Sequence, residues 1–362
     1  MGEKIDPWGS IQVEDYKETV KKFGIESLKD AKELRDNKLF RRNIVYGHRD
    51  FDKILDAIRN RKEFAMMTGM MPSGKFHFGH KLVADQIKFF QDKGAEIYIA
   101  VADVEAYLTR DMPLEKSREI ALNQYLKNYI ALGIDPEKIN FYFQSEGSSG
   151  YNTRSKLFSK NVTQNELEAI YGELSPNKTV SVLTQAADIL KPQFSENGGP
   201  RPVVVPVGID QDPHIRLTRD IASRYKRENF VKPSSIYNKF MRGLQGGKMS
   251  SSDPKSHISL DESVEKAKKK IDAAKTGGKQ SLEEHREKGA DVEEDIVFEL
   301  LAFHLIDDDK ELRRIYKEYN SGEMLSGELK MIAKDKMEDF LVSHHRKLGE
   351  AEEKVEEMFP QN

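Results

Sequence analysis

Apolar and polar positions follow two alternating patterns in the first two thirds of the chain. A mostly apolar run at 64–71, FAMMTGMM, ends in the Pro-Ser-Gly sequence at 72–74, which is typical of a short buried strand followed by a turn. Apolar residues then recur at roughly helical spacing over 80–94 and stop at Gly94, a suitable C-terminal cap. These patterns predict a strand, a tight turn and a helix.

The same alternation continues further along the chain. Apolar runs predict strands at 96–103, 139–145 and 202–210, and helical spacing predicts helices at 114–132 and 212–225. Because strands that alternate with helices form parallel sheets covered by helices, we expect an α/β, Rossmann-like domain over 61–255. Residues at about 110–200 look like an inserted, largely helical segment of this domain.

The two ends of the chain have a different composition. After residue 255 the sequence becomes charged and helical, and the stretch 326–358 repeats apolar residues at a helical period over many turns. We therefore expect a separate all-helical domain at 256–362. Residues 1–60 are predicted to form a charged, helical extension.

Composition narrows the possible functions. The chain has 362 residues, which leaves room for two or three domains. It contains no cysteine, so disulfides, thiolate metal sites and a cysteine nucleophile are excluded, and its nine histidines form no metal-ligand motif. No signal peptide or apolar run of about 18 residues is present, which predicts a cytoplasmic protein. The net charge of −3 means that nucleic-acid binding would need a local basic face.

The stretch PSGKFHFGH is the first candidate for chemistry. It lies where a strand ends and a helix begins, and a helix start at that edge of a parallel sheet offers free N–H groups to a phosphate. Gly74 and Gly79 allow a tight turn and close approach of a ligand, while His77 and His80 add side-chain donors. The alternative is that both histidines only cap the helix or pack in its first turn.

A second polar loop, GGKMSSSD at 246–253, combines a lysine with three hydroxyl groups. Taken alone, such a loop is equally consistent with a solvated connection. Together with His77 and His80, however, Lys248 would provide the charge neutralisation and positioning that phosphoryl or nucleotidyl transfer needs.

These two motifs resemble the HIGH and KMSKS signatures of class I aminoacyl-tRNA synthetases. They occur in the same order, about 170 residues apart, with Phe78 in place of isoleucine and Ser251 in place of the second lysine. The resemblance implies that His77, His80 and Lys248 are catalytic. It also implies ATP-binding residues, which are Ser73, Gly74, His77, Gly79, His80, Gly208, Asp210, Lys248, Met249, Ser250 and Ser251.

Within that class, GIDQDPHIRLTRDIA at 208–222 resembles tryptophanyl-tRNA synthetases of the archaeal and eukaryotic type, as do DPW at 6–8 and the segments 276–310 and 319–330. The resemblance implies ATP, with Mg²⁺ bound to the nucleotide, as cofactor and L-tryptophan and tRNA(Trp) as partners. It further implies a homodimer without a membrane segment, and no protein-bound metal.

Recognition of the indole is expected to depend on Asp188. Eukaryotic relatives use a tyrosine and a glutamine, where this chain has Met67 and Ala100, but TQAADIL at 184–190 resembles the bacterial MAADIL, whose aspartate accepts the indole N–H. An acceptor in a dry pocket can reject substrates that lack the donor by on the order of 10⁴–10⁵. The alternative is that Asp188 caps a helical turn.

The remaining tryptophan contacts follow from the same resemblance. Gln211 would hold the ammonium or carboxylate group, and Gly208 and Asp210 suit the ribose of ATP. The full predicted tryptophan-binding set is Gly69, Met71, Gln185, Asp188, Val205, Val207 and Gln211, although the apolar members, with Met67 and Met70, are equally ordinary core residues.

In the family, the C-terminal helical domain binds the tRNA anticodon. The basic run KAKKK at 266–270 could meet phosphates or be solvated helix surface, and Tyr316 and Tyr319 could stack on bases or be buried against neighbouring helices. Three other functions stay open. They are the related tyrosine enzyme, suggested by VADVEAYL at 101–108, a non-catalytic RNA-binding paralogue, and a small nucleotidyltransferase with an HxGH motif.

Overall fold

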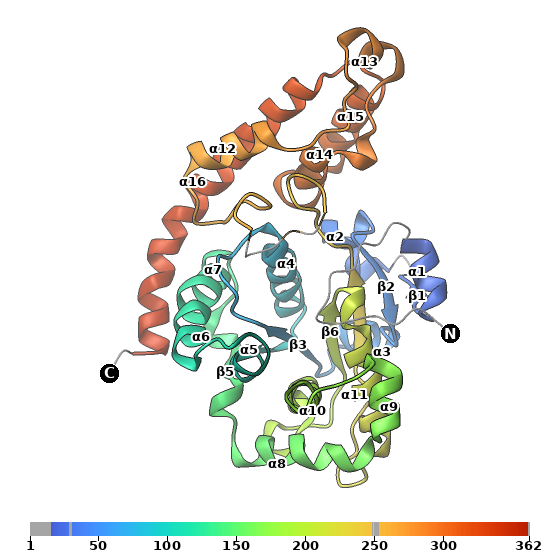
Figure 1. Cartoon of the computed structure of the whole chain (residues 1–362), viewed down its shortest axis with the longest axis vertical. Helices are drawn as coiled ribbons and strands as arrows, with labels where there is room; N and C mark the ends of the chain where they lie inside the picture. The colour runs from blue at the N-terminus through green and yellow to red at the C-terminus, as the bar shows by residue number, and fades with distance from the viewer. Residues whose placement is uncertain (1–15, 29–30, 248, 250–252, 361–362) are drawn as a thin grey trace. The chain divides into compact units, whose positions relative to one another are not determined.

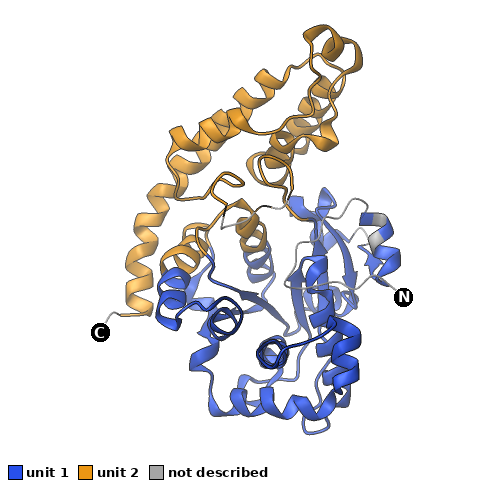
Figure 2. Ribbon diagram, in the orientation of Figure 1, with its two compact units in different colours: residues 1–73, 86–122, 134–239 blue, residues 74–85, 123–133, 240–362 orange. Residues whose placement is uncertain are grey.

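The computed structural model describes residues 16–28, 31–247, 249 and 253–360. The chain forms two compact units (Figure 2). The first consists of residues 1–73, 86–122 and 134–239, and the second of residues 74–85, 123–133 and 240–362. This division does not follow the expected domain order, whose boundaries at residues 60 and 255 stay a prediction.

A single sheet runs through the first unit. Among the described residues it has seven strands in the order β1-β2-β7-β6-β3-β4-β5. The five strands from β7 to β5 are parallel, which confirms the predicted α/β class. The strands are β1 (Glu26–Ser27), β2 (Val45–Arg49), β3 (Ala65–Met70), β4 (Glu96–Val101), β5 (Ile139–Phe143), β6 (Val203–Val207) and β7 (Ser234–Asn238).

The segment before residue 60, expected to be helical, also supplies two strands. β1 pairs with β2, and β2 pairs with β7, both in antiparallel orientation. β2 has the sequence VYGHR, whose glycine and polar residues hide the strand pattern. Its partner β7 lies almost 190 positions away, so the pairing is visible only in three dimensions.

Helices cover the sheet and fill the predicted insertion. The helix α4 (Phe78–Asp92) contributes its first residues to the second unit and the rest to the first. The other helices of the first unit are α1 (Tyr16–Lys22), α2 (Lys38–Arg41), α3 (Asp52–Asn60), α5 (Asp103–Arg110), α6 (Leu114–Ile120), α8 (Ser149–Leu157), α9 (Gln164–Tyr171), α10 (Pro176–Leu190) and α11 (Asp212–Arg224).

The core of the first unit has a sheet layer and a helix layer. In the sheet layer, side chains of β3, β4 and β6 pack against Ile189 of α10 and Ile215 of α11. In the helix layer, α8, α9, α10 and α11 bury a second apolar cluster, which includes Tyr151, Phe158 and Leu217. Helix α10 takes part in both layers, so residues on it lie between the sheet and the other helices.

The second unit contains mainly helices. The predicted helix at 326–358 is confirmed as α16 (Ser326–Met358), whose apolar residues Leu329, Ala333, Met337 and Leu341 are fully buried. The others are α7 (Lys127–Ala131), α12 (Val264–Ala273), α13 (Leu282–Lys288), α14 (Ile296–Leu300) and α15 (Asp309–Asn320). Helix α12 lies along α16 (Figure 1). In the described part of the chain, no helix is both long and apolar enough to span a bilayer.

Candidate active site

The strand order of the sheet reverses beside β3. The chain builds β3, β4 and β5 in one direction and then returns to place β6 on the other side of β3. Ligands of open α/β sheets bind beyond the carboxyl ends of the strands at such a reversal point. Ser73 follows β3 there, and Gly208, Asp210 and Gln211 follow β6, so the structure brings together at this edge four residues predicted from the sequence.

The HFGH turn belongs to the second unit, where the two predicted histidines lie together. The imidazole rings of His77 and His80 are stacked, with centroids 3.8 Å apart and an interplanar angle of 25°. The Nδ1 of His77 accepts the Gly79 N–H at 3.1 Å, and the Nδ1 of His80 accepts the His77 N–H at 3.2 Å. Because each Nδ1 is an acceptor, a neutral ring carries its proton on Nε2, and we assign this tautomer to both residues.

Both imidazoles are neutral at physiological pH. Burial, followed by the neighbouring His80 and His257, lowers the pKa of His77 to about 2. Burial and His257 lower the pKa of His80 to about 3. The Nε2 of His80 also lies 3.3 Å from the hydroxyl of Tyr125. The rings therefore offer neutral N–H donors, and positive charge must come from another residue.

The second motif meets the first within the second unit. Lys248, Ser250 and Ser251 lie outside the described residues, but Met249 is buried, and its Sδ is 3.4 Å from the place where a Cβ on Gly79 would lie. Further along the same segment, the ring of His257 lies 4.9 Å from that of His77. Met249 and His257 thus both lie beside the HFGH turn.

A separate polar cluster surrounds Asp188 in the first unit. Its Oδ1 accepts the hydroxyls of Tyr142 at 2.9 Å and Tyr151 at 2.7 Å, and its Oδ2 accepts the Gln144 side-chain amide at 2.7 Å. The ammonium of Lys191 lies 3.0 Å from the centre of the Tyr142 ring. Burial raises the pKa of Asp188 to about 6 against these hydrogen bonds and Lys191, which all lower it. These partners are side chains from β5, α8 and the residue after β5, whereas a helix cap would bind backbone N–H groups.

One turn earlier on α10, Gln185 points toward the residues that follow β6. Its side-chain amide lies 3.5 Å from the Oε1 of Gln211, a long contact. Its own Oε1 is buried and has no hydrogen-bond partner among the described residues. Since a buried acceptor without a donor is costly, this oxygen suits a polar ligand.

The predicted apolar contacts divide into core and accessible positions. Val205 is 4% exposed and belongs to the sheet cluster, together with Met67 and Ala100, so these side chains support the site from within the core. Val207 and Met71 are half-buried. Gly69 is exposed, and a Cβ there would meet nothing within 4 Å, which leaves open space over β3.

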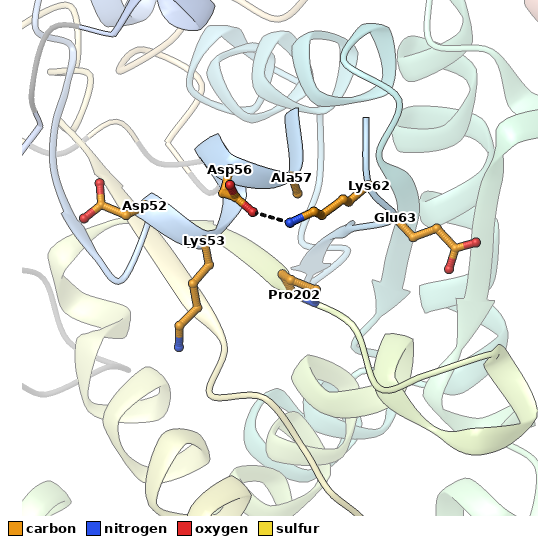
Figure 3. Close-up of a pocket in the computed structure, with 7 residues that line it drawn as sticks. All are labelled: Asp52, Lys53, Asp56, Ala57, Lys62, Glu63 and Pro202. Atoms are coloured by element: carbon orange, nitrogen blue, oxygen red, sulfur yellow. Dashed lines mark hydrogen bonds and ion pairs between the residues drawn. The ribbon is translucent and has the colours of Figure 1, made fainter. Parts of the chain in front are cut away.

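A pocket elsewhere in the first unit lies at the wrong edge for this chemistry. Figure 3 shows its lining residues, which come from α3 and from the segments that precede β3 and β6. An ion pair of 2.8 Å joins Lys62 to Asp56 beside it. Because it lies at the amino ends of these strands, it is separate from the candidate residues at their carboxyl ends.

Sequence reasoning missed several residues of these clusters. Tyr142 and Gln144 lie two positions apart on or next to β5, and Tyr151 lies on α8. The alternation along β5 places Tyr142 and Gln144 on one face, a signal that was available, but nothing in the sequence indicates that this face meets Asp188. His257 lies in a polar segment without a motif of its own.

A parallel sheet with a reversal point and a histidine pair at a helix start define a nucleotide-binding α/β protein. The family described as tRNA synthetases class I (W and Y) matches residues 59–342. The chain is 50% identical to a tryptophan–tRNA ligase of Methanocaldococcus jannaschii over 97% of this chain and 96% of that one. It therefore belongs to the class I tRNA synthetases of the W and Y family, as the two motifs predicted.

Solved structures agree with this assignment. The structure of tryptophanyl-tRNA synthetase from Aeropyrum pernix is similar, with a TM-score of 0.91 and 45% identity, and 98% of each chain is covered. A tryptophanyl-tRNA synthetase from Encephalitozoon cuniculi bound to tryptophan has a TM-score of 0.82 and 29% identity, with 96% of this chain and 98% of that chain covered.

Proposed function

We propose that the chain is a tryptophan–tRNA ligase, which activates L-tryptophan with ATP and transfers it to tRNA(Trp). The observation that carries the proposal is the near full-length match to relatives of that name, at 50% and 46% identity. The intact histidine pair beside Met249 supports a catalytic protein over a non-catalytic paralogue. The long helical second unit argues against a small nucleotidyltransferase.

The first step would be attack of the tryptophan carboxylate on the α-phosphate of ATP, in line with the departing pyrophosphate. No protein nucleophile is needed, because positioning both substrates can supply roughly 7–11 kcal/mol of the barrier. His77 and His80 would donate neutral N–H groups to the phosphates, and Lys248 would supply the positive charge. Mg²⁺ would enter with ATP, bound by its phosphates. The terminal ribose hydroxyl of the tRNA then takes the aminoacyl group.

Tryptophan would bind along α10 and the residues that follow β6. Gln185, whose Oε1 lacks a partner among the described residues, and Gln211 suit the polar backbone groups of the amino acid. Gly208 and Asp210 would contact the ribose. The side chain would extend toward the polar cluster of Asp188, which provides the buried acceptor that an indole N–H requires.

The helices of residues 256–362 would bind the anticodon region of the tRNA. In the basic run, Lys268 and Lys270 are paired with Glu338 and Glu262. Tyr319 is fully buried, which agrees with the expectation that it packs against neighbouring helices, so it cannot stack on a base. Phosphate contacts by the remaining lysines would position the tRNA without reading its sequence. We further propose that the enzyme is a cytoplasmic homodimer.

ATP–pyrophosphate exchange across the twenty amino acids tests the proposal. Tryptophan alone should support exchange. Exchange with tyrosine in place of tryptophan would assign the chain to the tyrosine enzyme, and exchange with none would favour a non-catalytic protein. Sedimentation of the purified chain tests the dimer, and filter binding with tRNA(Trp) against another tRNA tests the RNA partner.

A further inference from the structure

We propose that the hydroxyl oxygen of Tyr142 is the atom that accepts the indole N–H, and that Asp188 acts through it as a positioning residue. This inference rests on the proposed function and deepens it, because it names the group that selects the amino-acid side chain. Tyr142 would then be a specificity-determining residue.

The argument begins with the carboxylate of Asp188. Its side chain is only 2% exposed, and three protein donors already occupy it, two on Oδ1 and one on Oδ2. A carboxylate has about four lone-pair positions, so one position on Oδ2 is left, at an atom that is almost out of reach of any ligand. Direct acceptance of the indole by Asp188 would therefore need the cluster to open.

Hydrogen-bond donation to Asp188 fixes how the tyrosine hydroxyls can act toward a ligand. A phenol has one proton, and in Tyr142 this proton is directed at Oδ1. Burial and the charge of Asp188 raise the pKa of Tyr142 well above its usual value, so the proton is retained. The oxygen consequently offers lone pairs alone to anything else that approaches, which suits an indole, whose ring has one donor and no acceptor.

Accessibility distinguishes the two tyrosines. Tyr151 is 1% exposed and enclosed by the helix layer of the core. Tyr142 is half-buried and packs at the border of the sheet cluster, next to apolar side chains of β3, β4 and β6. It lies on β5, whose neighbour β4 adjoins β3 at the reversal point of the sheet. Tyr142 is thus the more exposed residue of the pair, and we assign the contact with the substrate to it.

Lys191 adds an electrostatic contribution at the same ring. Its ammonium lies 3.0 Å from the centre of the Tyr142 ring and 5.3 Å from that of Tyr151. This cation covers one face of the Tyr142 ring and offsets the charge of Asp188. Tyr142 is thus contacted at its hydroxyl by Asp188 and at one face of its ring by Lys191.

A tryptophan analogue in which sulfur replaces the indole N–H, 3-benzothienylalanine, tests the inference. In pyrophosphate exchange, the unaltered chain should prefer tryptophan over the analogue by about 10- to 100-fold in kcat/KM, because the analogue leaves a buried acceptor unpaired. In Tyr142→Phe this preference should fall toward one. A loss of folding would lower both activities alike and leave the ratio unchanged, so the ratio reports the acceptor itself.

Tyr151→Phe is the matched control, since it removes the other hydroxyl from the same Oδ1. This variant should lower kcat/KM for both substrates but keep the preference for tryptophan at more than half of the wild-type value. If Tyr142→Phe keeps the wild-type preference while Asp188→Asn loses it, Asp188 is the direct acceptor and the inference is overturned. A wild-type preference near one would also overturn it. If the unaltered chain gives no exchange with tryptophan, the proposed function fails, and this inference fails with it.

Discussion

Arg49 and Asp212 form a buried ion pair although 163 positions separate them in the sequence. The Nε of Arg49 lies 2.8 Å from Oδ1 of Asp212, and its Nη2 lies 3.0 Å from Oδ2. The Asp212 carboxylate is fully buried and also accepts the hydroxyl of Tyr237 at 2.5 Å. Arg49 donates further to the carbonyl oxygens of Phe23 and Gly24. The first turn of α11 is therefore attached to β2, to β7 and to the segment that precedes β1.

Loss of Arg49 should destabilise the first unit strongly. Arg49→Ala leaves the buried charge of Asp212 with weaker compensation, and we expect a loss of about 3–5 kcal/mol in the free energy of unfolding. Arg216 contacts the same carboxylate at 3.1 Å but is 47% exposed, so Arg216→Ala is the control and should cost less than about 1 kcal/mol. Urea unfolding of both variants measures the difference. Equal losses in the free energy of unfolding of the two variants would show that Arg49 is not the main partner of Asp212.

Removal of a phosphate-binding group should slow chemistry without weakening tryptophan binding. For His77→Ala and Lys248→Ala we expect adenylate formation to fall by on the order of 10²–10³, because each donor or charge supplies about 3–4 kcal/mol in the transition state. Pyrophosphate exchange measures the rate, and equilibrium dialysis with labelled tryptophan measures the affinity. Near-normal exchange in either variant would show that the phosphate assignment is wrong.

A methyl group at Gly79 should displace His77. A Cβ there would lie 3.0 Å from Cε1 and 3.1 Å from Nδ1 of His77, closer than carbon atoms normally approach. Gly79→Ala should therefore lower exchange by about 10-fold or more, with the loss in kcat or the KM for ATP. Gly349→Ala on α16 is the control, because a Cβ there meets nothing within 4 Å and alanine favours a helix by about 1 kcal/mol. Full activity in Gly79→Ala would contradict the predicted clash.

Tryptophan binding should weaken in acid through Asp188. Its pKa is raised to about 6 in the folded chain, so between its ordinary value near 4 and about 6 the folded state holds the extra proton. The contribution of this group to the stability of the fold therefore increases as the pH falls through 6. Tryptophan binding changes in the opposite direction, because the protonated acid no longer orients both tyrosine hydroxyls. The KM for tryptophan should rise about tenfold per pH unit below 6. In Asp188→Asn the KM for tryptophan should be high at neutral pH and should not change as the pH falls. A wild-type KM that stays constant down to pH 5 would contradict the role of the carboxylate.

Local patterns were sufficient for the elements whose burial follows one period. In α16 the apolar residues Leu329, Ala333, Met337 and Leu341 recur on one stripe, and the structure buries that stripe over the predicted range. Four of the five parallel strands, β3 to β6, were predicted from mostly apolar runs between turn residues, whereas β7, with the sequence SSIYN, was not predicted. The family and the two motifs also followed from sequence.

Long-range partners could not be predicted in this way. The sequence indicated that Asp188 is a buried acceptor, but its donors come from β5 and α8, and only the packing of α10 brings them together. The strand β2 escaped detection because its pattern is short and polar and its partner β7 is distant in sequence. His257 is polar in a polar segment, and only its contact with His77 distinguishes it.

The convergence of two phenol groups on one oxygen of Asp188 has a consequence for redesign of the enzyme toward non-natural amino acids. A substitution at residue 188 alone leaves two hydroxyls and one amide to find new partners in a buried space, so libraries at this single position should yield chains of reduced activity. Productive libraries would vary residues 142, 144, 151 and 188 together, so that the groups left behind by one change find partners supplied by another.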